Sequence, residues 1–170
     1  MRKYLIPILL LLFSFAAFAQ KPNKQPSDPK QEIKAAFDRL IEGIRQLDAE
    51  KVMSVYEKSD RILFFNNNGT VTIGWENMLK NRQSLYARTK NVNLEITGLR
   101  IEMLSPQSAY LTCKWKQTQE FDGELEFASG RMTLIFKRIG KEWKAVHLHT
   151  SPDNPELTRP VFKSERQTQN

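Results

Sequence analysis

Apolar residues recur at helical spacing near the start of the chain. Intervals of three and four residues place them on one face, which predicts an amphipathic helix packed against a core. Asp28 can cap this helix and Pro29 suits its first position, so we expect the helix to begin there. The apolar positions are Ile33, Ala36, Phe37, Leu40, Ile41, Ile44 and Leu47.

Two more helices are expected, one before and one after a short hairpin, and both before the long strands. Asp48 stands where a cap would open a short second helix that ends near Tyr56. A third helix is predicted from about Trp75 to Thr89, because its apolar residues fall on one side. These residues are Trp75, Met78, Leu79, Leu85 and Tyr86.

The remaining segments alternate between apolar and polar residues, which is typical of strands. Residues 61–66 and 70–74 flank Asn67-Asn68-Gly69, and residues 108–120 and 124–138 flank Asp122-Gly123, so both pairs are predicted hairpins. Further strands are expected over residues 92–104 and 143–151. The apolar alternation of residues 92–104 changes face at Gly98, which predicts a bulge, and Ser129-Gly130 predicts a second irregularity.

Helices followed by long antiparallel strands predict an α+β domain with about three N-terminal helices packed on one face of a curved antiparallel sheet. Strands that bend at glycines curve the sheet, and a curved sheet closed by helices leaves a hollow. Such a hollow is the physical basis for expecting a small-molecule pocket.

The N-terminus has the layout of a secretory signal peptide. Arg2 and Lys3 precede an apolar run that ends in Ala17-Phe18-Ala19, so we expect cleavage near Ala19 and export to the periplasm or the medium, with no membrane span left after cleavage. A transmembrane anchor is the alternative, but the run is short and Pro7 interrupts it. We expect residues 20–30 to be a flexible tether, residues 31–151 the domain and residues 152–170 a flexible polar tail.

Charge and cysteine content exclude several classes of protein. The 170 residues carry a net charge of +7, with 19 acidic residues among 26 basic ones, which is not the basic stripe of a nucleic-acid-binding protein. A single cysteine, Cys113, rules out an internal disulfide, and its alternation with Leu111 and Trp115 favours a buried position.

The order of elements, the opening of the third helix at Ile73-Gly74-Trp75-Glu76 and the last strand at residues 143–151 resemble the nuclear-transport-factor-2-like superfamily. The last strand, with its Trp143…His147-Leu148-His149 pattern, is similar to the SnoaL-like branch and to the association domain of calcium/calmodulin-dependent kinase II. The resemblance implies a cone-shaped fold, a pocket at its wide end and a homodimer formed through the sheet. It implies no single chemistry, since members include enzymes, adaptors and assembly modules.

His147 and His149 are the only histidines and the only candidates for acid–base catalysis. The alternative is that they hydrogen-bond within the sheet or at a dimer interface. Strict alternation places both on one side of the last strand with Trp143 and Ala145, but does not decide which side meets the hollow. No third metal ligand accompanies the pair, so we expect neither a metal nor another cofactor.

Five side chains are candidate ligand-binding residues because of their expected inward position or their charge. Each has an ordinary alternative, either as core or, for the arginine, as solvated surface. The five are Tyr56, Trp75, Tyr86, Trp115 and Arg131.

Three functions remain open from the sequence. The first is an exported domain that binds a small, partly apolar molecule without assigned catalysis. The second is a dimerisation or assembly module that uses the face of the sheet. The third is a lyase, isomerase or hydrolase in which a last-strand histidine is the acid or base.

Overall fold

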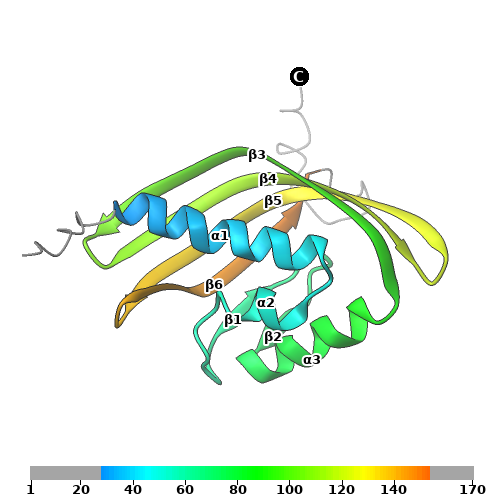
Figure 1. The fold of residues 1–170 in the computed structure, drawn as a ribbon, viewed down its shortest axis with the longest axis horizontal. Coiled ribbons are helices and arrows are strands. Elements are labelled where there is room, and N and C mark those ends of the chain that lie inside the picture. Colours follow the sequence, from blue (N-terminus) through cyan, green and yellow to red (C-terminus); the bar gives the residue numbers. More distant parts are fainter. Residues whose placement is uncertain (1–27, 154–170) are drawn as a thin grey trace, which may run out of the picture.

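The computed structural model describes residues 28–153, which form three helices and a six-stranded sheet (Figure 1). The predicted signal peptide, most of the tether and most of the tail lie outside the described residues. The helices are α1 (Pro29–Arg45), α2 (Ala49–Met53) and α3 (Trp75–Tyr86). The strands are β1 (Leu63–Phe65), β2 (Val71–Ile73), β3 (Thr89–Ser105), β4 (Ser108–Phe121), β5 (Glu124–Ile139) and β6 (Glu142–Pro152). The predicted α+β class is confirmed.

Both predicted aspartate caps are present. The Asp28 carboxylate accepts a hydrogen bond from the Lys30 amide, and the Asp48 carboxylate accepts one from the Lys51 amide. The third helix ends at Tyr86, earlier than predicted, because Thr89 already pairs with Phe121 as the first residue of β3.

The sheet has the order β2-β1-β6-β5-β4-β3, and one of its pairings corrects the sequence prediction. All neighbouring strands are antiparallel except β1 and β6, which run parallel, so the sheet is mixed. An isolated parallel bridge between Tyr56 and Ala145 shows why: the chain leaves α2 beside β6 and enters β1 in the same direction.

The long strands contain irregularities in their pairing. One of the two predicted from the sequence is present, and another occurs where none was predicted. The bulge at Gly98 is confirmed, since the β3–β4 register shifts between Thr97 and Arg100. The irregularity predicted at Ser129-Gly130 is wrong, because the β4–β5 register passes through both residues unbroken. A register shift occurs instead in β6, where His147 pairs with Ile135 but Ala145 pairs with Phe136, leaving Val146 as the extra residue.

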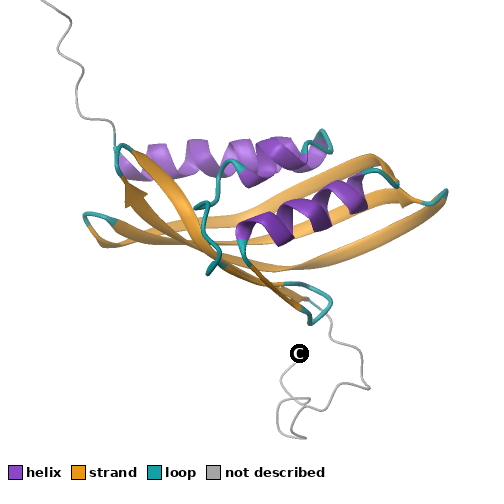
Figure 2. Ribbon diagram, turned by 90° about the horizontal axis from the view of Figure 1, so that it is seen from below, coloured by secondary structure: helices purple, strands orange, loops and turns teal. Residues whose placement is uncertain are grey.

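The helices lie within the curve of the sheet and give the domain its cone shape. α1 crosses the long strands, and α3 lies beside the end of the sheet where the β4–β5 hairpin extends (Figures 1 and 2). Around the first half of α1 lies a cluster of buried side chains; we call this the packed end, formed by Ile33, Phe37, Leu111, Phe136 and Trp143, all at most 3% exposed. The opposite end, around α3 and the β4–β5 hairpin, contains a cavity, and we call it the cavity end.

Candidate functional site

A cavity of about 830 Å³ opens between the helices and the inner face of the sheet at the cavity end. Its volume lies in the range of small-molecule sites in proteins. Apolar side chains of α1, α3 and three of the long strands form one part of its wall, among them Leu40, Ile44, Met78, Leu94, Met132 and Leu148. Polar side chains of α3, of the β1–β2 turn and of the β4–β5 hairpin complete it.

Trp115 is buried in this wall with an unsatisfied hydrogen-bond donor. It points inward from β4, is 7% exposed, and its Nε1 has no partner among residues 28–153. The other two tryptophans are satisfied: Trp75 Nε1 donates to the Met53 carbonyl and Trp143 Nε1 donates to Glu32 Oε2, both at 2.9 Å. Trp115 is thus the exception among the three indoles, and it is the one that borders the cavity.

Gly130 makes room for the Trp115 ring. A Cβ atom at this position would lie 2.9 Å from Trp115 Cζ2, 3.0 Å from Asn67 Oδ1 and 2.4 Å from the Ser151 carbonyl oxygen. All three distances are shorter than ordinary packing allows. The absence of a side chain at Gly130 therefore lets the indole and the β1–β2 turn approach β5.

Arg82 brings a positive charge to the cavity from α3. Its Nε is buried and has no partner among the described residues, while Nη1 lies 3.4 Å from the Tyr86 hydroxyl. No carboxylate of residues 28–153 lies within ion-pairing distance of its guanidinium. Glu126, also in the wall, is exposed and accepts a hydrogen bond from Gln119 Nε2 at 2.8 Å.

Tyr56 adds a neutral hydroxyl to the wall. The side chain is 3% exposed, and its ring meets Phe64 edge-on with centroids 5.0 Å apart. Burial raises the pKa of the Tyr56 phenol well above its usual value, and the opposing effect of the nearby Arg82 charge is smaller. The phenol therefore keeps its proton at neutral pH and is available as a hydrogen-bond donor.

A network of amides and hydroxyls forms the polar side of the cavity. Asn66 Nδ2 donates to Thr70 Oγ1 and Thr72 Oγ1, both at 3.1 Å, and Asn81 Nδ2 approaches Thr72 Oγ1 at 3.4 Å. Asn67 Oδ1 is buried in the same wall and has no partner in the part of the chain that the structure describes. Together with Trp115 Nε1 and Arg82 Nε, this makes three unsatisfied buried atoms around one cavity.

Comparison with known protein families identifies the family of this domain. The family model for the SnoaL-like domain matches residues 33–155, most of the chain. The chain belongs to the SnoaL-like domain family. A search of the curated proteins found no match.

Solved structures of the nuclear-transport-factor-2-like superfamily share the fold of this SnoaL-like domain. A superfamily protein from Salmonella enterica matches with a TM-score of 0.69 and 19% identity, over 78% of this chain and 96% of that chain. A Xanthomonas campestris protein, provisionally assigned as a calcium/calmodulin-dependent protein kinase II association domain, matches with 0.64 and 17%, over 77% and 91%. A ketosteroid isomerase-like protein from Erwinia carotovora matches with 0.63 and 16%, over 74% and 96%. Identities this low establish the common fold and nothing finer.

The structure brings only two of the seven sequence-derived candidates into the cavity wall of the SnoaL-like domain. Tyr56 and Trp115 border it, whereas Trp75 and Tyr86 are buried beside it in the core. Arg131 is exposed on the outer face of the sheet, paired with Lys114 across the strands, and its Nη2 lies 3.4 Å from the Pro152 carbonyl oxygen.

His147 and His149 also lie on the outer face, away from the cavity. The extra residue in β6 reverses the alternation expected from the sequence: Trp143 and Ala145 face the core, but beyond Val146 it is Leu148 that faces inward. His147 Nδ1 is 3.1 Å from the Leu63 carbonyl oxygen, and Phe65 meets both imidazoles edge-on at 5.2 and 5.7 Å. Neither histidine borders the cavity.

Sequence reasoning missed the polar residues of the cavity wall, although their positions carried a signal. Arg82 lies on the same helical stripe as Met78 and Tyr86, so a charged residue occupied an inward position. Gln117 and Gln119 continue the inward alternation that includes Trp115. Polar residues at positions that the pattern assigns to the core indicate a site rather than a surface.

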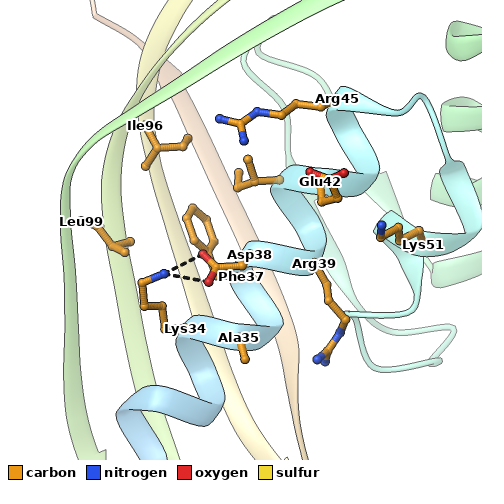
Figure 3. A pocket seen from close by; sticks show the side chains of 11 residues that line it. Lys34, Ala35, Phe37, Asp38, Arg39, Glu42, Arg45, Lys51, Ile96 and Leu99 are labelled. Carbon is orange, nitrogen blue, oxygen red and sulfur yellow. Dashed lines mark hydrogen bonds and ion pairs between the residues drawn. The ribbon is translucent and has the colours of Figure 1, made fainter.

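A second hollow, between α1 and β3, has the character of an ordinary surface groove. Phe37, Ile96 and Leu99 form its floor, and charged side chains surround it (Figure 3). Several of those charges have partners: Lys34 pairs with Asp38, and Arg45 donates to the Leu94 carbonyl at 2.7 Å. No buried unsatisfied atom of the described residues borders this groove, in contrast to the cavity.

The described residues hold neither a cluster of metal-ligating side chains nor a helix that could span a membrane. Within residues 28–153, no group of three or more His, Cys, Asp or Glu side chains is arranged to hold a metal ion. None of the helices in the same range has the length and apolar character needed to cross a membrane.

Proposed function

We propose that this SnoaL-like domain binds a small, partly apolar molecule in the cavity at its cavity end. The observation that carries the proposal is that all three buried polar side-chain atoms without partners, among the described residues, border this cavity. Leaving a buried polar group unsatisfied costs about 1–3 kcal/mol, so a ligand that supplies partners recovers that free energy. The apolar wall supplies the remaining affinity.

Binding of a neutral naphthalene probe, N-phenyl-1-naphthylamine, tests this proposal. Its fluorescence should rise with the protein, and Ala128→Trp, which adds an indole to the cavity wall, should weaken binding about tenfold or more. Ala35→Trp is the matched control, because Ala35 borders only the α1–β3 groove. Equal binding by both variants and the unmodified protein would show that the probe binds elsewhere and would contradict the proposal.

We also infer that the protein performs this function after export. The support is the N-terminal layout of Arg2, Lys3, an apolar run and the Ala17-Phe18-Ala19 end. N-terminal sequencing of protein recovered from the native host should begin at Gln20. An intact Met1 would contradict export by this route.

Assembly through the outer face of the sheet is the second candidate function. Leu63 and Phe65 of β1 pair with Ile73 and Val71 of β2, and all four side chains point outward and are 37–56% exposed. His147 lies beside this patch on β6. Association of two copies would cover these apolar side chains, and the likeness to a protein named as an association domain supports the idea.

Light scattering tests the assembly function. The mature protein should have the mass of a dimer at micromolar concentration, and Val71→Lys with Ile73→Lys should shift it to a monomer by burying charges at the interface. Lys114→Glu, on the outer face away from the patch, is the control for an effect of charge alone. A monomer in the unmodified protein would contradict this function.

We do not propose acid–base catalysis by His147 or His149. A catalytic imidazole must reach the reacting group of the substrate, and both rings lie on the face opposite the cavity.

A further inference from the structure

The packed end shows how this protein holds a carboxylate. Glu32 Oε2 accepts a hydrogen bond from Trp143 Nε1 at 2.9 Å and another from Arg138 Nη1 at 3.1 Å. Both donors belong to the sheet, and the carboxylate comes from α1. An indole N–H and a guanidinium thus share one carboxylate oxygen, which satisfies both donors at once.

The cavity end contains the same two kinds of donor without the carboxylate. Trp115 Nε1 comes from the sheet and Arg82 from α3, and both border the cavity with unsatisfied N–H groups. The Tyr56 phenol, which burial keeps protonated, is a third donor in the same wall. Three donors, one of them charged, therefore border a cavity in which no carboxylate of residues 28–153 pairs with them.

We propose that the ligand of this cavity is an apolar monocarboxylic acid, whose carboxylate pairs with Arg82 and whose oxygen atoms accept hydrogen bonds from Trp115 and Tyr56. The proposal rests on the small-molecule site described above and specifies its ligand class. The carboxylate of the ligand would do at the cavity end what the Glu32 carboxylate does at the packed end.

The charge of the wall favours one negative charge on the ligand. Arg82 supplies a single positive charge, and Glu126, the other charged residue in the wall, is exposed and accepts from Gln119. A phosphate monoester, with nearly two negative charges, would leave one of them uncompensated beside apolar side chains, which is unfavourable. The rest of the ligand should be apolar, because it would contact Leu40, Leu94 and Met132.

The Tyr86 hydroxyl does not substitute for a ligand carboxylate. It lies 3.4 Å from Arg82 Nη1, longer than a good N–H···O hydrogen bond, and it is neutral. Arg82 Nε remains unsatisfied despite this contact. A guanidinium has five N–H donors in a planar fork that fits a carboxylate, so most of its capacity is unused in this arrangement.

A pair of probes of nearly equal shape tests the ligand class on the unmodified protein. Calorimetric titration with 2-naphthoate and with 2-naphthamide, at neutral pH, should give an affinity at least about tenfold higher for the acid. Raising the salt concentration should reduce this preference, because the added interaction is electrostatic. Equal affinity for the two probes would overturn the proposal.

Variants then assign the preference to Arg82. Arg82→Gln should lose about tenfold or more of the naphthoate affinity and change the naphthamide affinity by less than about twofold, whereas Arg82→Lys should retain part of the preference. Lys80→Gln is the matched control, because it removes an exposed cation from the same helix. Trp115→Phe, which keeps an aromatic ring, should reduce naphthoate binding about threefold or more.

These experiments distinguish an error in the ligand class from an error in the small-molecule site. If N-phenyl-1-naphthylamine binds and Ala128→Trp blocks it, but the acid has no advantage, the small-molecule site stands and the ligand class is wrong. If Arg82→Gln weakens both naphthalene probes equally, Arg82 shapes the wall rather than recognising a carboxylate, and the ligand class is again wrong. If no probe binds at all, the small-molecule site itself is contradicted.

Discussion

The two ends of this SnoaL-like domain are built from the same strands, yet one is filled and the other is hollow. At the packed end, the inward positions of β4 and β5 hold Leu111 and Phe136, both fully buried. Farther along the same strands, the inward positions hold Gln117, Ala128 and Gly130. Side chains that are small or polar cannot fill the space that the curved sheet leaves, so the cavity follows from the sequence of the strands.

The two ends also differ in whether their buried polar groups have hydrogen-bond partners. At the packed end the indole of Trp143 and the guanidinium of Arg138 share the Glu32 carboxylate, whereas at the cavity end Trp115 and Arg82 have no such partner among residues 28–153. The packed end stabilises the fold through satisfied burial. The cavity end gives up part of that stability and keeps donors available, which is the usual compromise at a functional site.

The largest expected effect lies at the packed end. Phe136→Ala should lower the free energy of unfolding by about 3–5 kcal/mol, because Phe136 is fully buried and the surrounding residues cannot collapse into the space. Urea unfolding followed by circular dichroism measures the change. Phe127→Ala, at a side chain that is 74% exposed at the cavity end, is the control and should cost less than about 1 kcal/mol. Similar losses for the two variants would contradict the distinction between the ends.

A smaller loss is expected at the glycine that supports the cavity wall. Gly130→Ala should destabilise the protein by about 1–3 kcal/mol, since its Cβ would lie 2.4 Å from the Ser151 carbonyl oxygen and 2.9 Å from Trp115 Cζ2. The same substitution should weaken probe binding by displacing the indole. Chemical denaturation and fluorescence titration measure the two effects.

A double variant separates the two clashes at Gly130. Trp115→Phe removes Cζ2, so Gly130→Ala combined with Trp115→Phe should cost less than the sum of the single changes. Strict additivity would show that the strain lies only at the Ser151 carbonyl and that Gly130 does not position the ring.

Trp143 and Trp115 form a matched pair that tests the stability contributed by one hydrogen bond. The indole of Trp143 makes this bond at the packed end, and the indole of Trp115 makes none with the described residues at the cavity end. Trp143→Phe removes the donor to Glu32, while Trp115→Phe removes a donor with no partner among the described residues. Both changes remove similar ring volume, so Trp143→Phe should destabilise the free protein by about 1–2 kcal/mol more than Trp115→Phe. Thermal and urea unfolding of the two variants measure the difference. A larger loss for Trp115→Phe would indicate that its Nε1 has a partner in the folded protein.

Much of the fold was predictable because its signals are local. The helical stripe of α1, the aspartates that begin α1 and α2, and the bulge at Gly98 each follow from a few neighbouring residues. The parallel pairing of β1 with β6 was not predictable in this way, because it joins strands far apart in the sequence. The extra residue at Val146 was hidden for a similar reason: no glycine or turn residue accompanies it, and only the pairing with β5 reveals it.

That one residue decides on which face the two candidate catalytic histidines lie. Without it, His147 and His149 share a face with the core residue Trp143; with it, they lie on the outer face. Tyr56 and Trp115 were placed in the wall because a buried aromatic carries a strong local signal. Arg82 was overlooked because a charged residue on a helix is usually solvated, and only its three-dimensional surroundings distinguish it.

The smallest expected effect concerns Cys113, which lies between Leu111 of the packed end and Trp115 of the cavity end. Burial raises the pKa of the Cys113 thiol from 9.0 to about 11, so the unfolded chain loses this proton first as the pH rises. The contribution of the protonated thiol to stability is therefore complete below about pH 9 and is lost between about pH 9 and pH 11.

Cys113→Ala lacks this contribution. The difference in free energy of unfolding between the unmodified protein and the variant should therefore narrow by about 1 kcal/mol between about pH 8 and pH 10.5. This is less than the full shift would give, because solvent screens part of it. Urea unfolding at the two pH values measures the narrowing. Parallel pH profiles of the two proteins would mean that water reaches the thiol, and that the hollow extends farther toward the packed end than the burial of Cys113 indicates.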